Sequence, residues 1–241
     1  MQHQFGRDPK GGEYDADAYE AIGLRLPRIG EPAVPFRVRT TQGERSLEMY
    51  RGRWLLLFSH PSDFTPVCTS EFIAFAKAYP IFQAMGCDLL GVSVDSVFSH
   101  LAWLQSIRSV FGVHVPFPIA EDLSMALAAA YGMIHPGDTN TSTVRATFLI
   151  DPAGTVRVIS YYPMANGRNV DEMVRALSAL QETDASGLST PAGWQPGDDG
   201  VLPPPTTEQE VAAREASNAP TWYYAPTRAP ARPAGPVTSS T

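Results

Sequence analysis

Residues 54–85 read WLLLFSHPSDFTPVCTSEFIAFAKAYPIFQAM. The first six residues, Trp54–Ser59, form a continuous apolar run that is typical of a buried strand. A second segment, Thr69–Met85, predicts a helix that Pro80 bends without ending. Its apolar side chains recur at helical spacing: Phe72, Phe75, Tyr79 and Phe82. The chain therefore passes from a buried strand to a helix through a short polar loop, as in proteins that alternate the two elements.

Strands and helices continue to alternate after this unit. We expect a strand over Asp88–Asp95, helices over Ser96–Val110 and Asp122–Tyr131, strands over Ala146–Asp151 and Thr155–Tyr161, and a helix over Asn169–Gln181. Asn169 and Glu172 fit a variant of the capping box at the start of the last helix. This order predicts an α/β fold with a central mixed sheet flanked by helices.

Composition divides the chain into segments of different character. Residues 1–23 are polar and rich in Gly and Asp, so we interpret them as a flexible N-terminal extension. Residues 24–183 hold the alternating pattern and form the main domain. Over residues 184–224 the composition shifts to Pro, Gly and Asp, which indicates a small C-terminal domain or arm with one short helix capped by Thr207 and Glu210. The Pro-rich residues 225–241 are expected to be disordered.

The composition excludes several functional classes. The chain of 241 residues has 18 Lys and Arg against 25 Asp and Glu, a net charge of −7, which argues against binding to nucleic acid or to an anionic membrane surface. No stretch is apolar enough for a membrane helix, and the N-terminus lacks the apolar segment of a signal peptide. The two cysteines, Cys68 and Cys87, exclude a disulfide framework and a multi-cysteine zinc site. We therefore expect a cytoplasmic protein with reduced thiols and no metal or cofactor.

Cys68 lies where the loop of the opening stretch becomes a helix. In a first helical turn, unpaired backbone N–H groups and the positive end of the helix dipole favour a thiolate over a thiol. Thr65 stands three residues earlier, and its hydroxyl can hydrogen-bond the sulfur or a bound oxygen. A lone cysteine can also be a small buried hydrophobic residue. Position alone leaves both interpretations open.

Several spaced motifs resemble those of the peroxiredoxins, in the same order. The segment Pro61-x-x-x-Thr65-x-x-Cys68 reproduces the P-x-x-x-T-x-x-C signature, which Glu71 completes to T-x-x-C-T-x-E. Later matching segments are Asp95-Ser96 with His100 and Trp103, Arg145–Pro152, Gly167–Asn169, and Thr190-Pro191-Ala192-x-Trp194-x-Pro196-Gly197. The last of these resembles the C-terminal extension of the one-cysteine subfamily. The resemblance covers about residues 24–224.

This resemblance implies a thioredoxin-like fold and a role for each matching residue. Cys68 would be the peroxidatic nucleophile, which attacks a peroxide as the thiolate and becomes a sulfenic acid. Arg145 matches the active-site arginine of the family, whose permanent charge stabilises the thiolate and holds the polarised peroxide. Thr65 would donate or relay a hydrogen bond to the peroxide, and Pro61 would shield the sulfur from bulk water.

Three supporting positions keep two interpretations each. Glu71 and Arg168 resemble groups that orient the active-site arginine, but charges at helix starts also form ordinary surface ion pairs. His60 directly precedes the signature, as in the one-cysteine subfamily, where a histidine neighbours the sulfur. A histidine at this position equally fits a cap at the end of a strand.

The resemblance also implies substrates and partners. The protein would reduce hydrogen peroxide and organic hydroperoxides in antioxidant defence and redox homeostasis. Its partners would be the peroxide, an external thiol or other reductant, and a second copy in a homodimer that can assemble further. The C-terminal arm carries a large aromatic surface that we expect at contacts between subunits: Trp194, Trp222, Tyr223 and Tyr224.

Rival functions differ from a peroxidase in identifiable ways. Thioredoxin-like disulfide exchange normally needs a C-x-x-C pair, but Thr65 stands three residues before Cys68. A lipase-like activity accompanies a G-D-S-W-G motif in some one-cysteine members, and here Arg53 stands where that serine would be. A peroxide sensor or holdase chaperone without sustained turnover stays open, and steady-state turnover distinguishes it from a peroxidase.

Cys87 bears on how oxidised Cys68 is reduced. It lies 19 residues after Cys68, just beyond the predicted helix. Because a helix rises about 1.5 Å per residue, the two Cα atoms should be ~28 Å apart, whereas a disulfide needs about 7 Å or less. We therefore expect Cys87 to be a packed structural thiol, so that an external donor reduces Cys68.

Overall fold

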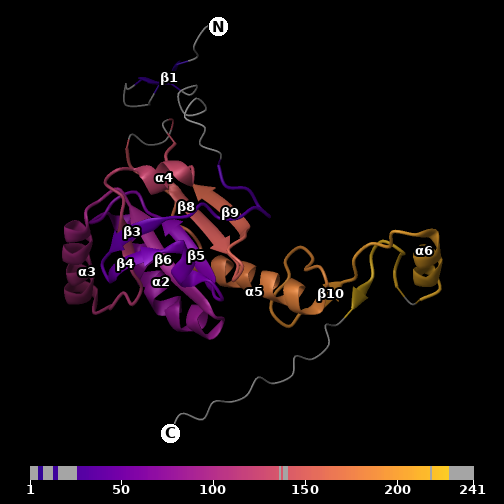
Figure 1. The fold of residues 1–241 in the computed structure, drawn as a ribbon. Coiled ribbons are helices and arrows are strands. Elements are labelled where there is room, and N and C mark those ends of the chain that lie inside the picture. Colours follow the sequence, from indigo (N-terminus) through magenta and orange to yellow (C-terminus); the bar gives the residue numbers. More distant parts are fainter. Residues whose placement is uncertain are drawn as a thin grey trace. The chain divides into compact units, whose positions relative to one another are not determined.

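The computed structural model describes residues 5–7, 13–15, 26–135, 137, 141–217 and 219–227 (Figure 1). The chain forms two compact units, Met1–Asp171 and Glu172–Thr241. The division falls in the first turn of helix α5 (Val170–Ser186).

The first unit is built on a mixed sheet of seven strands in the order β4-β3-β7-β6-β5-β8-β9. The strands are β3 (Arg37–Thr40), β4 (Gly43–Ser46), β5 (Trp54–Ser59), β6 (Cys87–Ser93), β7 (Ile119–Glu121), β8 (Arg145–Ile150) and β9 (Val156–Tyr162). Strand β6 is parallel to both of its neighbours, β5 and β7, and the other pairs are antiparallel. The predicted mixed sheet is therefore confirmed.

Three helices accompany the described sheet: α2 (Pro66–Ala84), α3 (Val97–Phe111) and α4 (Ala126–Ala130). Helix α2 begins at Pro66 instead of Thr69, because a proline needs no N–H partner at the first helical position. It continues through Pro80, as predicted. Helix α4 is shorter than the predicted Asp122–Tyr131, because the Asp122 carboxylate accepts the N–H groups of Leu127 and Ala128 and caps the helix.

The hairpin of β3 and β4, the 3-10 helix η1 (Leu47–Tyr50) and strand β7 were not predicted. The hairpin strands read RVRT and GERS, so they lack the apolar run that marked the other strands. They lie at one edge of the sheet, where fewer of their side chains need to be apolar.

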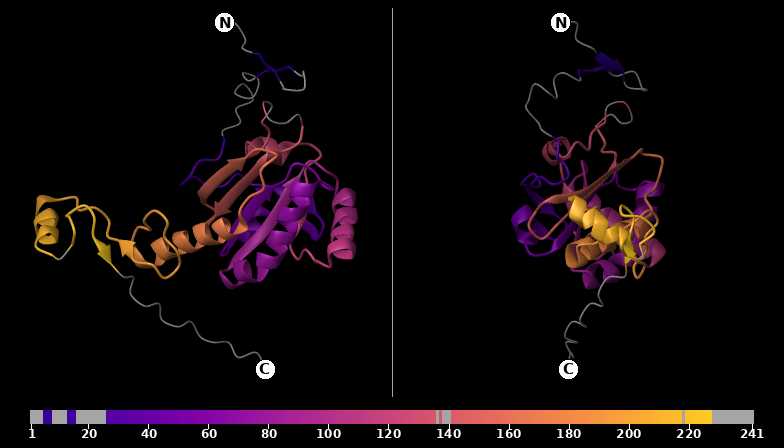
Figure 2. Two further views of the ribbon diagram at one scale, coloured as in Figure 1. Left: turned by 180° about the vertical axis from the view of Figure 1, so that it is seen from behind. Right: turned by 90° about the vertical axis from the view of Figure 1, so that its right-hand side faces the viewer.

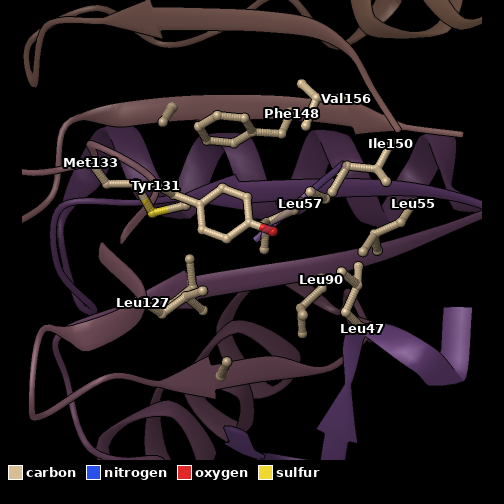
Figure 3. Close-up of a cluster of buried hydrophobic side chains, with 14 of the residues drawn as sticks. Leu47, Leu55, Leu57, Leu90, Leu127, Tyr131, Met133, Phe148, Ile150 and Val156 are labelled. Carbon is tan, nitrogen blue, oxygen red and sulfur yellow. The ribbon is translucent and has the colours of Figure 1, made fainter. Parts of the chain in front are cut away.

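The residues of β5 alternate between two faces of the sheet. Leu55 and Leu57 belong to a buried cluster that includes Tyr131 and Phe148 (Figure 3). Phe58 points to the other face, where its ring stacks on Phe75 of α2 with centroids 4.4 Å apart. This aromatic contact packs α2 against the sheet near the carboxyl end of β5.

Helix α3 packs beside α2 on the same face (Figure 2). The ring of Trp103 lies 4.7 Å from that of Phe72, and Phe72 lies 5.5 Å from Phe58. The Ser96 hydroxyl caps α3 by accepting the N–H of Ser99. The aromatic contacts place Phe72 of α2 between Phe58 of the sheet and Trp103 of α3.

The second unit contains α5 from Glu172 onward, strand β10 (Gly200–Val201), helix α6 (Glu208–Glu215) and strand β11 (Pro226–Thr227). Helix α6 begins with the predicted capping box of Thr207 and Glu210. Strand β11 uses the first residues of the predicted tail, and residues 228–241 lie outside the described residues. Of the predicted N-terminal extension, the structure describes β1 (Phe5–Arg7) and β2 (Glu13–Asp15), which pair antiparallel.

Candidate active site

Cys68 lies in the first turn of α2, and its side chain is fully buried. Thr65 is the N-cap residue, but its hydroxyl donates to the Ser62 carbonyl at 2.8 Å instead of accepting a helix N–H group. The lone pairs of that hydroxyl therefore remain the groups that a peroxide O–H could meet. Pro61 is buried at the start of the same loop.

Arg145 reaches Cys68 from the start of β8. The antiparallel pairing of Phe58 with Thr147 carries Arg145 just past the end of β5. Its Nη1 donates to Cys68 Sγ at 3.4 Å and to Glu71 Oε2 at 2.8 Å. Its Nε and Nη2 donate to the Met164 carbonyl at 3.0 and 2.6 Å. The guanidinium is thus held on two sides and aimed at the sulfur.

Glu71 and Arg168 form a buried pair behind Arg145. The backbone N and Nε of Arg168 donate to Glu71 Oε1 at 2.7 and 2.9 Å, and its Nη2 donates to Oε2 at 2.8 Å. The Arg168 side chain is 0% exposed and the Glu71 side chain is 2% exposed, so this is not a surface ion pair. Burial opposes ionisation of Glu71, but the hydrogen bonds and charge of Arg168 outweigh it and lower the pKa of the carboxyl below its usual value.

The charges in this buried group do not cancel by themselves. Glu71 contributes one negative charge, and Arg145 and Arg168 contribute one positive charge each. One positive charge therefore remains, and Arg145 presents it to the sulfur. A negatively charged group placed against the sulfur would neutralise this charge.

His60 is placed differently from the other predicted residues. Its Nε2 lies 2.9 Å from Asp63 Oδ1, and its ring stacks on Trp103 with centroids 5.2 Å apart. Its Nδ1 is buried without a hydrogen-bond partner. Burial lowers the pKa of His60, although the hydrogen bond to Asp63 opposes this shift.

The structure therefore places Arg145 on Cys68, Glu71 and Arg168 behind Arg145, and Thr65 at the N-cap of the helix that carries Cys68, and it joins His60 to Asp63. Sequence reasoning missed two groups. The Met164 carbonyl is a backbone atom, so no residue type could reveal it. Asp63 lies inside the signature loop, but its partner His100 is 37 residues away in the sequence.

Cys87 is also buried, at the start of β6. Burial, together with the nearby charge of Asp88, raises its pKa to about 12. It is therefore a neutral thiol at physiological pH, which suits a packed structural residue.

Comparison with known proteins identifies the family. Residues 29–159 match the AhpC/TSA family, and residues 179–218 match the C-terminal domain of 1-Cys peroxiredoxin. A peroxiredoxin of Aquifex aeolicus is 46% identical over 213 residues, covering 83% of this chain and 96% of the relative. One from Thermoplasma volcanium is 47% identical over 196 residues, covering 81% and 96%. No described helix is long and apolar enough to cross a membrane.

Solved structures of peroxiredoxins also resemble the fold of this chain. Yeast mitochondrial 1-Cys peroxiredoxin, studied for thiol resolution through the glutathione and thioredoxin systems, superposes with a TM-score of 0.75 at 38% identity, covering 84% of this chain and all of that one. A mutant of peroxiredoxin 6 of Arenicola marina gives a TM-score of 0.71 at 34% identity, covering 77% and 88%. With a thioredoxin-like fold and the C-terminal domain of the one-cysteine subfamily, the chain belongs to the peroxiredoxins, which are thiol-dependent peroxidases.

Proposed function

We propose that Cys68 reduces hydrogen peroxide and organic hydroperoxides by direct attack of its thiolate. The sulfur forms a bond to one peroxide oxygen while the O–O bond breaks. The other oxygen leaves with a proton as water or an alcohol, and Cys68 becomes a sulfenic acid. The observation that supports this most strongly is the 3.4 Å contact of the Arg145 guanidinium with the buried sulfur.

Each surrounding residue has a role in this proposal. Arg145 stabilises the thiolate and then the negative charge that develops on the leaving oxygen. Thr65 accepts the hydrogen bond of the peroxide O–H, because its own hydrogen is already donated to Ser62. Pro61 shields the sulfur from water. Glu71 and Arg168 hold Arg145 in place, and His60 supports the loop through Asp63.

An external thiol attacks the sulfenic sulfur, releases its oxygen as water and forms a mixed disulfide, and a second thiol then releases Cys68 as the thiol and leaves as the disulfide of the two donors. The chain offers only Cys87 as an internal alternative, and that residue is buried at the start of β6, beyond the end of α2. The protein would act in the cytoplasm, where thiols stay reduced, in antioxidant defence and redox homeostasis. It would be a homodimer, with the aromatic side chains of Trp222, Tyr223 and Tyr224 at contacts between subunits. These three side chains are 40%, 62% and 47% exposed in the single chain. Trp194, which we also expected at such contacts, is instead 3% exposed in the single chain, and its indole N–H donates to the Asp198 carbonyl.

The deciding experiment follows peroxide consumption by the purified protein with a panel of reductants. We expect many turnovers per chain with at least one thiol donor, and none with Cys68→Ser. Cys87→Ser is the matched control and should keep the wild-type rate. One equivalent of peroxide consumed per chain with every donor would refute the peroxidase and favour a peroxide sensor or holdase chaperone.

A further inference from the structure

Asp63 is clamped between two buried histidines that come from different elements. Its Oδ1 lies 2.9 Å from His60 Nε2, at the end of β5, and its Oδ2 lies 2.8 Å from His100 Nδ1, on α3. The two histidine side chains are 0% exposed and the Asp63 side chain is 1% exposed. The second ring nitrogen of His100 lies 3.2 Å from the Ala120 carbonyl.

The partners of this group determine how many protons it holds. A backbone carbonyl can only accept, so His100 Nε2 must carry a hydrogen. Each contact with Asp63 also needs one hydrogen between nitrogen and oxygen. Burial opposes ionisation of Asp63, but the hydrogen bonds from His100 and His60 outweigh it and lower its pKa, so the hydrogens reside on the rings. His100 then donates from both ring nitrogens, to Asp63 and to the Ala120 carbonyl, and His60 donates from Nε2 to Asp63.

The same contacts fix the loop that carries the reactive residues. The backbone N–H of Asp63 donates to Asp95 Oδ2 at 3.0 Å, so both ends of this residue are held. Ser62, the neighbour of Asp63, accepts the Thr65 hydroxyl through its carbonyl. The position of the Thr65 side chain therefore depends on where the clamp, formed by His60, Asp63 and His100, holds the loop.

Helix α3 is also tied to the first turn of α2. Trp103, on the same helix as His100, donates to the Thr69 hydroxyl at 3.3 Å and stacks on the ring of His60. The Thr69 hydroxyl in turn donates to the Thr65 carbonyl at 2.7 Å. The clamp therefore holds Thr65 through Ser62, which precedes it in the sequence, and the hydrogen bonds from Trp103 hold it through Thr69, which follows it.

We propose that Asp63 and His100 are positioning residues for peroxide reduction, and that the hydrogen bond between them holds the Pro61–Thr65 loop against α3. The inference rests on the function proposed above. The charged groups that face the pair from neighbouring elements are Asp95, after β6, and Glu121, at the end of β7, which is itself paired with Arg39.

The ligand atoms of His60, Asp63 and His100 also lie within 4.8 Å of one another, which is metal-ligand spacing. Because each Asp63 oxygen already lies at hydrogen-bond distance from a ring nitrogen, the geometry favours protons over a metal ion.

The kinetic test compares Asp63→Asn with a matched control, Asp122→Asn. Asp122 is equally buried and also accepts hydrogen bonds, but from the N–H groups of Leu127 and Ala128, which belong to the core cluster on the opposite face of the sheet. Misplacing a reacting group by about 1 Å can cost ~10²-fold in rate. We expect Asp63→Asn to lower the second-order rate constant with hydrogen peroxide by about 10- to 10²-fold, and Asp122→Asn to change it less than about twofold at a similar loss of melting temperature.

A spectroscopic measurement separates positioning from simple loss of stability. In nitrogen NMR of the histidine rings, both nitrogens of His100 should carry hydrogens at neutral pH in the wild-type protein. In His100→Gln, which keeps Asp63 intact and serves if Asp63→Asn does not fold, the rate constant should fall by a similar factor.

Three results would overturn the inference. They are a His100 ring with one bare nitrogen at neutral pH, wild-type rate constants in both variants, or one metal ion per wild-type chain that is lost in Asp63→Asn. If the wild-type protein itself showed no peroxide turnover, the proposed function would fail and this inference with it. Normal wild-type turnover with unaffected variants would refute the inference alone.

Discussion

Replacing Arg145 by glutamine removes the one positive charge that the buried cluster presents to the sulfur. With Glu71 and Arg168 left to neutralise each other, a Cys68 thiolate would become an unpaired buried charge. At 3.4 Å and an effective dielectric constant of about 20, a unit pair is worth ~5 kcal/mol. Part of that is replaced by the helix dipole of α2, whose first turn holds the sulfur.

The expected loss in rate follows from this charge. Removing one preorganised donor typically costs ~10²–10³-fold, or about 3–4 kcal/mol, which lies just below the Coulomb figure. We therefore expect Arg145→Gln to lower the second-order rate constant for oxidation by hydrogen peroxide by about 10²–10³-fold.

Stopped-flow fluorescence measures this rate, because Trp103 hydrogen-bonds to Thr69 in the first turn of α2 and so reports on the site. Arg53→Gln is the control, since Arg53 pairs with Asp88, next to Cys87, and not with the site around Cys68. Near-native kinetics in Arg145→Gln would show that the contact seen here does not activate the sulfur, and the assignment of this arginine would be wrong.

Three further outcomes are expected. Intact-mass measurement after peroxide, without reductant, should show stepwise addition of oxygen at Cys68; a loss of two daltons mapped to a Cys68–Cys87 bond would contradict the external-donor mechanism. The folded-state pKa of Glu71 lies below the ordinary value of 4.5, so its ion pairs stabilise the protein fully above that pH, and this stability is lost as the pH falls through the lowered pKa. Urea midpoints should therefore drop on acidification below about pH 4.5, and Glu71→Gln should flatten this dependence; an unchanged slope would argue against the pair. Truncation after residue 183 should convert the proposed dimer to a monomer in light scattering, and an unaltered dimer would remove the C-terminal arm from the interface.

The elements with strong local patterns were predictable from sequence. Strand β5 and helix α2 were found because one is a continuous apolar run and the other repeats its aromatic residues at helical spacing. The β3–β4 hairpin was missed because its charged side chains lie at a sheet edge, where solvent replaces neighbours. Asn169 does accept an N–H near the start of α5, from Asp171, whereas the Glu172 carboxylate binds Arg175.

The residues of the candidate site likewise divide into those that local sequence patterns predict and those that only the fold brings together. Cys68 and Thr65 are neighbours in the sequence, so a strand, a loop and a helix start already place them together. Arg145 is 77 residues from Cys68, and only the pairing of β5 with β8 brings it close. Without the family resemblance, no spacing in the chain points to that arginine. The clamp on Asp63 was missed for this reason too, since it depends on how α3 packs.

The carbonyl of Met164 has a consequence for how the chain tolerates change. Two donors of Arg145 bind this main-chain oxygen, which every amino acid supplies. Side-chain substitutions at position 164 therefore leave the acceptor in place, and an alanine scan would pass over it. Deleting one residue between β9 and Arg168 would shift the oxygen along the chain instead. The position of Arg145 therefore depends on the length of the loop between β9 and Arg168, and not on which amino acid stands at position 164.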